Sequence, residues 1–425
     1  MAYCCERCEV EIVRTGNKLS HMRLLSRLTF VTLFMITLTV HPADTNTISD
    51  VKNLAGSNTA FALDLYAQLK IADGNLFFSP YSISACLAMT YAGARGNTAT
   101  QMAQTLRFAT NQNQLAVSFG QLQKQLNDEQ TKQAFELNIA NGIWAQKEHP
   151  LLPAYLSVAR DQYRANLQQA DFRTHAEAAR VAINDWVSEQ TKGKISNLIQ
   201  PGLLAPATRL VLVNAIYFKG RWASEFDKQN TIKSPFSIAP AQTVVVPFMN
   251  ITADFKYAEV EGLQVLELPY AGNDLAMVIL LPGETDGLKT VEGQLASLDR
   301  WLAHAREQKV ELLLPKFKLA AQFSLAKNLT EMGLSDAFSP QADFSGMDGE
   351  RDLYISAVVH KAFVEVNEEG TEAAAATGVV MRSMAVMRPR PTPVFRADHP
   401  FIFLIRDSRS GSILFLGRMV DPTRS

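Results

Sequence analysis

Residues 359–403 read VHKAFVEVNEEGTEAAAATGVVMRSMAVMRPRPTPVFRADHPFIF, and they decide how the rest of the chain is interpreted. Alternation of apolar and polar residues predicts a strand at Phe363–Val366 and another around Val394 to Phe403. The segment between them carries Gly370, Thr371 and four alanines, whereas a turn is typically built from Gly, Asn, Asp, Ser or Pro. Such small side chains can lie in a strand as easily as in a coil. The chain therefore has a long loop that is suited to becoming a strand.

Small side chains suit a segment that must slide between two existing strands, because each of them has to pass through a packed layer. A loop that does this holds a folded protein in a metastable state until it is cut, as in the serpin family of serine protease inhibitors. The sequence EEGTEAAAAT resembles the hinge of inhibitory serpins at every position. The simpler alternative is a helix-forming alanine run in an ordinary surface loop. The predicted hinge comprises Glu368, Glu369, Gly370, Thr371, Glu372, Ala373, Ala374, Ala375, Ala376 and Thr377.

The composition is that of an ordinary globular protein. The 425 residues are 47% hydrophobic and 20% charged, which is enough for one large domain or for several small ones. A net charge of −1 gives no electrostatic footprint for nucleic acid or for an acidic membrane. Cys86 is the single cysteine after Cys8, so a disulfide framework is excluded in the body of the chain.

Residues 22–43 have the form of a secretory signal peptide. Arg23 and Arg27 precede an apolar run from Leu28 to Val40 that is too short to cross a bilayer comfortably. Residues 1–21 fit no such signal, and we expect them to be a mis-assigned start or a dispensable leader. The protein is therefore predicted to be secreted or periplasmic. An uncleaved membrane anchor is the alternative, because the cleavage site is poor.

The resemblance to serpins extends from about Ser49 to Pro422. Its most specific part is NAIYFKGRW at Asn214–Trp222, which overlaps an apolar strand predicted at Leu210–Phe218. Residues 49–425 are therefore expected to form a single α+β domain with the serpin fold. The resemblance implies a large, central, mostly antiparallel sheet, two further sheets, about eight or nine helices, and an exposed reactive-centre loop.

Hydrophobic periodicity predicts several elements of this domain by itself. A long strand is expected at Phe135–Gln146, and a nearly all-apolar helix at Ser82–Thr90 must be buried on most sides. A second helix is expected at Val181–Ile199, with Gly193 as a capping glycine near its end. A strand at Glu311–Lys318 contains a proline and is therefore placed at a bulge.

Catalytic signatures do not accompany this pattern. The chain has no GxSxG, HExxH or GxxxxGK[ST] motif, and its body has no CxxC pair. Ser324 opens a lone Ser-x-x-Lys without the partner motifs of a β-lactamase, and it is interpreted as a helix N-cap. His149, His175 and His304 are isolated, without metal-ligand spacing. We therefore expect no enzymatic activity, no metal and no cofactor.

The resemblance also implies two groups of buried residues that control the central sheet. The shutter is a polar network that holds the sheet closed, and the breach is the place where the loop enters it. The shutter corresponds to Ser79, Ser82, Asn214 and His360. The breach corresponds to Trp222 and to an ion pair between Lys316 and Glu368.

The family's spacing places the reactive bond in the loop. Seventeen residues counted from Glu368 end at Met384, so the predicted bond joins Met384 to Ala385. Arg382–Ser383 and Arg388–Pro389 are the competing candidates. Before cleavage the loop is expected to lie outside the sheet.

The function implied by the resemblance is suicide-type inhibition of serine endopeptidases, with cysteine endopeptidases as a second target class. The acyl-enzyme would be trapped by insertion of the loop into the central sheet. A non-inhibitory serpin that acts as a binding or chaperone-like protein is the alternative, but such members tend to carry proline, charge or bulk in the hinge. Met384 suits elastase-, chymotrypsin- or subtilisin-like enzymes, with trypsin-like enzymes as the alternative. We expect a monomer without a nucleic-acid partner, and no feature indicates a polyanion cofactor.

Overall fold

The computed structural model describes residues 43–130, 135–371 and 391–424. The chain divides into two units, Met1–Pro42 and Ala43–Ser425, and the fold below is that of the second. The predicted leader and nearly all of the predicted signal peptide therefore lie outside the described residues. Within the described ranges, no helix is both long and apolar enough to cross a membrane.

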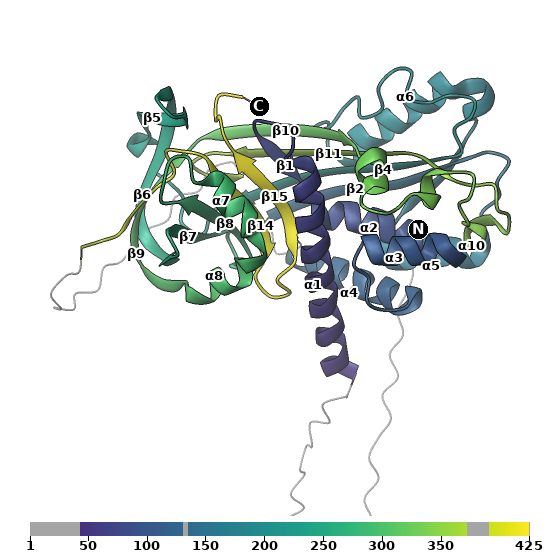
Figure 1. Ribbon diagram of the computed structural model, residues 1–425, viewed down its shortest axis with the longest axis horizontal. Coiled ribbons are helices and arrows are strands. Elements are labelled where there is room, and N and C mark those ends of the chain that lie inside the picture. The colour runs from purple at the N-terminus through teal and green to yellow at the C-terminus, as the bar shows by residue number, and fades with distance from the viewer. Residues whose placement is uncertain (1–42, 131–134, 372–390, 425) are drawn as a thin grey trace, which may run out of the picture. The chain divides into compact units, whose positions relative to one another are not determined.

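The described residues form ten α-helices (Figure 1). They are α1 (Ala43–Leu69), α2 (Pro80–Tyr91), α3 (Gly96–Thr105), α4 (Gln112–Gln130), α5 (Pro153–Tyr163), α6 (Phe172–Gln190), α7 (Leu288–Gly293), α8 (Leu298–His304), α9 (Ala326–Glu331) and α10 (Ser345–Asp348). Helix α2 is buried at every position, as its nearly all-apolar sequence predicts. Helices α7, α9 and α10 span only four to six residues, which is too short to give a helical period in the sequence.

One sheet in the described residues has six strands in the order β10-β11-β12-β4-β2-β3. The strands are β2 (Phe135–Gln146), β3 (Asn166–Ala170), β4 (Leu210–Arg221), β10 (Phe317–Ser324), β11 (Ile355–Val366) and β12 (Gly370–Thr371). Strands β11 and β4 also pair directly and in parallel, while β10–β11 and β2–β4 are antiparallel. The short strand β12 enters between β11 and β4 only at one end.

A second sheet has nine strands, with β5 beside β6 and the others in the order β1-β15-β14-β8-β7-β6-β9-β13. The strands are β1 (Leu76–Phe78), β5 (Ile232–Ala239), β6 (Gln242–Val260), β7 (Leu263–Pro269), β8 (Leu275–Pro282), β9 (Arg306–Pro315), β13 (Val394–Arg396), β14 (Phe401–Asp407) and β15 (Ile413–Met419). The resemblance implied two separate sheets here. They are continuous because β6 is 19 residues long and pairs with β5, β9 and β7 along its length.

The six-stranded sheet is covered on both faces. Val211 and Val213 of β4 pack with Ile183 and Val187 of α6 in one buried cluster. Leu212, on the opposite face of β4, belongs to the main core that also contains α2. This alternation follows from the two-residue period of a strand. Only a segment without bulky or charged side chains could therefore join the sheet at low cost.

Several boundaries differ from the prediction. Helix α6 begins at Phe172 rather than at Val181, and the strand expected around Val394 to Phe403 is divided between β13 and β14. Helix α6 ends at Gln190 rather than at Ile199, because Lys192 and Gly193 both have positive φ angles that no helix continues through. Pro315 lies at no bulge but ends β9, and Phe317 begins β10 in the other sheet. Ser324 is the last residue of β10 and caps no helix, since α9 begins after it with no side-chain cap.

Candidate functional site

The entrance to the six-stranded sheet lies where β11 and β4 separate. Their parallel pairing runs from Ile355 and Leu210 to Phe363 and Tyr217. Beyond it, Thr371 of β12 pairs with Val366 of β11 on one side and with Gly220 of β4 on the other. The first residues of the loop already lie between the strands. The expectation that the whole loop lies outside the sheet before cleavage is therefore wrong.

The two residues of β12 fit this position closely. The Thr371 side chain is fully buried, and its hydroxyl lies 2.9 Å from that of Tyr270. Gly370 has a φ of 151°, and a Cβ there would lie 2.0 Å from the carbonyl oxygen of Gly220. Only glycine can occupy this point, because any side chain would collide with the β4 backbone.

The predicted breach residues meet beside β12. The Trp222 ring stacks on Tyr270 with centroids 4.6 Å apart, and its Nε1 donates to the carbonyl of Asn367 at 2.9 Å. Two backbone bonds fix the next turn of the chain, from Trp222 N to the Glu369 carbonyl and from Phe226 N to the Glu368 carbonyl. Trp222 thus holds the base of the loop against β4.

Glu368 is the charged centre of the breach. Its carboxylate lies 2.8 Å from Lys316 Nζ and accepts a hydrogen bond from Thr231 Oγ1 at 2.8 Å. Burial would raise the pKa of Glu368, but the hydrogen bonds from Lys316, the backbone and Thr231, together with the lysine charge, lower it below its usual value. The predicted pair of Lys316 and Glu368 is therefore present as an ion pair whose acid is held in its charged form.

The predicted shutter residues also meet, halfway along the sheet. Asn214 and His360 face each other across β4 and β11, and His360 Nδ1 donates to Asn214 Oδ1. Asn214 Nδ2 donates to the Ser82 carbonyl at 3.0 Å, and Ser79 N donates to His360 Nε2 at 3.1 Å. All four residues are 0–1% exposed. The network joins β4 and β11 to each other and to the start of α2.

His360 fits this network only as a neutral ring. Nδ1 donates to Asn214 and Nε2 accepts from Ser79, so a second proton on Nε2 would break the bond from Ser79. Burial lowers the pKa of His360 to about 3. The shutter therefore holds one tautomer of a neutral histidine.

Asn141 of β2 also belongs to this network, although it was not among the predicted site residues. Its Oδ1 accepts from Asn214 Nδ2 and, at 3.4 Å, from Ser82 Oγ. Asn141 lies opposite Asn214 in the register of β2 and β4. The available signal was a polar residue in the middle of a long strand, but no sequence period says which polar residue lies beside it.

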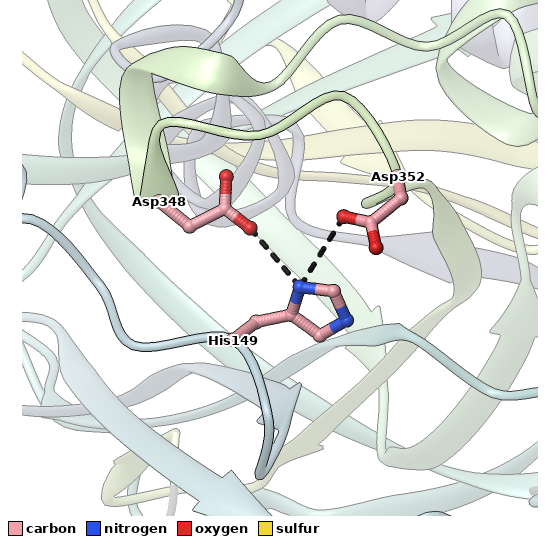
Figure 2. A group of neighbouring side chains, drawn as sticks. All are labelled: His149, Asp348 and Asp352. Carbon is pink, nitrogen blue, oxygen red and sulfur yellow. Dashed lines mark hydrogen bonds and ion pairs between the residues drawn. The ribbon is translucent and has the colours of Figure 1, made fainter.

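His149 was predicted to be isolated, and this prediction is wrong. Its Nδ1 lies 3.1 Å from a carboxylate oxygen of Asp348 and 3.3 Å from one of Asp352, as Figure 2 shows. His149 lies 199 positions before Asp348 in the chain, so no local spacing could have indicated the cluster. Among the residues that the structure describes, His175 has one such partner, Asp171 at 3.1 Å.

The remaining predicted site residues lie outside the described residues. They are Glu372, Ala373, Ala374, Ala375, Ala376, Thr377, Met384 and Ala385.

Comparison with known proteins gives consistent matches over nearly all of the described residues. A family model described as Serpin (serine protease inhibitor) matches residues 56–422. The leukocyte elastase inhibitor of Homo sapiens is 43% identical over 385 residues, which cover 88% of this chain and 100% of that inhibitor. The crystal structure of human thyroxine-binding globulin complexed with thyroxine has 33% identity and a TM-score of 0.79, over 88% of this chain and 99% of that one. Serpin48 of Tenebrio molitor, described as a highly specific serpin, has 33% identity and a TM-score of 0.78, over 90% and 99%.

The prediction of a secreted or periplasmic protein is wrong. The leukocyte elastase inhibitors that match this chain are intracellular proteins without a signal peptide. The matched segment is 88% of this chain, and it covers the full length of the human and bovine inhibitors. A short apolar run after two arginines is a weak compositional signal, and these full-length matches outweigh it.

Proposed function

The chain belongs to the serpin family of serine protease inhibitors, and we propose that it inhibits its target by inserting its own cut loop into the six-stranded sheet. The predicted α+β serpin fold is confirmed. The prediction that the chain is not an enzyme is also confirmed, because serpins inhibit proteases and are not catalysts. The partner is a serine endopeptidase that attacks a bond in the loop and is held as an acyl-enzyme.

The observation that carries the proposal is the position of β12 between β11 and β4. Strand β12 is antiparallel to both neighbours, whereas β11 and β4 are parallel to each other. Lengthening β12 would replace one parallel ladder with two antiparallel ones, which are slightly more stable per residue. Insertion would therefore add backbone hydrogen bonds on both sides of the new strand, and this gain favours the inserted form.

The register of β12 also supports the proposed role of the shutter. Counting onward from the pairs of Thr371 with Val366 and Gly220 places Thr377 between His360 and Asn214 after insertion. The bond between His360 and Asn214 must then break. A threonine hydroxyl both donates and accepts, so it can take a place in the network that it divides.

The proposed target is an elastase-like serine protease. The relatives are named as elastase inhibitors, and Met384 offers a medium apolar side chain at the counted position. Chymotrypsin- and subtilisin-like enzymes accept similar side chains, while Arg382 and Arg388 would direct trypsin-like enzymes to other bonds.

Incubation with a panel of serine proteases, followed by denaturing gel electrophoresis, tests the proposed function. An acyl-enzyme complex should survive denaturation and appear with elastase-like enzymes. Cleavage without any complex would contradict inhibition. It would favour a non-inhibitory role in binding; the name of thyroxine-binding globulin states that this structural relative binds a ligand.

Cleavage by the target should release a C-terminal fragment that begins at Ala385. The reason is the seventeen-residue count from Glu368 to Met384, which sets the length of the strand to be inserted. N-terminal sequencing of the fragment measures this directly. A fragment that begins at Ser383 would refute the count and assign a trypsin-like specificity.

A further inference from the structure

The cluster of His149, Asp348 and Asp352 lies away from the shutter and the breach. His149 follows β2, Asp348 ends α10, and Asp352 lies just before β11. Each side chain offers one atom to the same small space, and the three atoms lie within 4.8 Å of one another (Figure 2).

Apart from His149, no basic side chain among the described residues balances the two carboxylates of this cluster. The Asp348 side chain is only 1% exposed, and that of His149 is 11% exposed. Among the described residues, neither Asp348 nor Asp352 forms an ion pair with a lysine or an arginine. A neutral imidazole has a single Nδ1 proton to share between two carboxylates. The nearly buried Asp348 carboxylate therefore lies where a bound cation would be favourable.

The distances suit a metal ion of the zinc class. A tetrahedral zinc ion with bonds of about 2.0 Å places neighbouring ligand atoms about 3.3 Å apart. The two distances from His149 Nδ1, 3.1 and 3.3 Å, match the edges of such a tetrahedron. One imidazole nitrogen and two carboxylate oxygens are ligands that zinc binds, and a fourth position would be open toward the exposed Asp352.

Two of the three ligands are already held in place. The Glu350 amide donates to Asp348 Oδ1 at 2.9 Å and leaves Oδ2 directed at His149. The amide of Leu152 donates to the Met347 carbonyl at 2.6 Å, which ties the chain after His149 to α10. Asp352 has 66% side-chain exposure and is the movable third ligand.

We propose that His149, Asp348 and Asp352 bind a divalent metal ion such as Zn²⁺, and that the bound ion opposes insertion of the loop. The second step rests on the proposed function. Ala145 of β2 and Ile355 of β11 both lie opposite Leu210 of β4, so the cluster sits at the end of the sheet that is remote from β12. A strand inserted between β11 and β4 would move β11 away from β2 by about 4.8 Å.

This displacement carries Asp352, three residues before β11, away from the pair formed by His149 and Asp348. The three ligand atoms lie within 4.8 Å of one another, so they cannot all stay bound to one ion when one of them moves by such a distance. Metal binding and loop insertion therefore oppose each other, and by linkage each weakens the other by the same factor.

Equilibrium dialysis of the uncut full chain against Zn²⁺ tests the site without reference to inhibition. The wild type should bind one ion more per chain than Asp352→Asn or His149→Gln. His175→Gln is the matched control, because it removes a histidine that has a single carboxylate partner, and it should bind as the wild type does. All four proteins keep Cys4, Cys5 and Cys8, so metal held by those thiols cancels in the comparison.

Saturating Zn²⁺ should raise the melting temperature of the wild type by a few degrees and leave that of Asp352→Asn unchanged.

The link to insertion is tested with cleaved protein whose raised melting temperature shows that the loop has entered the sheet. The affinity of this cleaved form for Zn²⁺ should be at least about tenfold lower than that of the uncut form. Equal stoichiometry in the wild type and both site variants overturns the metal site. Equal affinity in the two forms overturns the opposition to insertion. Cleavage without a rise in melting temperature counts against the proposed function instead, and the stoichiometry then decides the metal site.

Discussion

Ala375→Arg is expected to convert the protein from an inhibitor into a substrate of its target protease. The register of β12, counted onward, places Ala375 between Ala362 of β11 and Ile216 of β4 after insertion. Both neighbours are fully buried, so the arginine would lose its hydration at a cost of several kcal/mol. Insertion should stall while the acyl bond is hydrolysed. Since each 1.4 kcal/mol is a factor of ten, the yield of denaturation-resistant complex should fall by at least about tenfold.

The matched control is Ala375→Ser, which keeps the side chain small and should retain most of the complex. Melting temperature gives a second readout. Cleaved wild type should melt on the order of 10 °C or more above the uncut form, because about ten residues gain ladder hydrogen bonds on both sides. Cleaved Ala375→Arg should gain much less. If the wild type gains nothing, loop insertion does not occur and the proposed mechanism fails.

Thr371 is a poorer position for this test, although it is the first side chain of the hinge to enter the sheet. It is already fully buried in the uncut protein and contacts the Tyr270 hydroxyl. A charged side chain there would disturb the uncut fold as well as the insertion, so the two effects could not be separated.

Acidification from pH 7.5 to pH 5 is expected to destabilise the uncut protein by about 2 kcal/mol through His360 alone. Burial lowers the pKa of His360 from its ordinary value of 6.5 to about 3. Between these values the unfolded chain binds a proton that the folded shutter excludes. The contribution of His360 to the free energy of unfolding is therefore fully present above pH 6.5 and is lost as the pH falls toward 3. Urea unfolding of the uncut protein at a series of pH values measures the loss.

His360→Gln is the control for this acid effect, because its amide can still accept from Ser79 or donate to Asn214. The variant should be less stable at pH 7.5 but should lose much less stability on acidification. Calorimetry provides a measurement on the wild type itself, since unfolding at pH 5 should take up close to one proton at this site. An unchanged slope in His360→Gln would assign the acid sensitivity to other groups. The lowered pKa of Glu368 contributes in the same direction, but only at lower pH, near its own range.

Sequence patterns predicted the elements whose apolar pattern is clear along their whole length. Strand β2 has the predicted bounds, and α2 is buried throughout because its sequence is apolar on every side. Patterns failed where a boundary depends on a partner elsewhere in the chain. The segment around Pro315 is apolar on both sides of the proline, and only the tertiary structure divides it between two sheets.

The site residues divide in the same way. The resemblance named Ser79, Ser82, Asn214 and His360, and the structure brings them together in one network. Asn141 was missed because its partner is set by the register of β2 with β4. His149 was missed because its carboxylate partners approach from a distant segment.

The short strand β12 changes the kinetic problem that the loop has to solve. We expect the start of a strand between two others to be the slow step, because several residues must be ordered before the first hydrogen bonds form. Here Gly370 and Thr371 are already paired with their neighbouring strands in the uncut protein, so insertion has only to extend an existing strand. Substitutions close to Thr371 should then slow the whole process, whereas those near Thr377 should set how far it runs once begun. The position of a hinge mutation, and not only its size or charge, would decide whether a protease is released early or late.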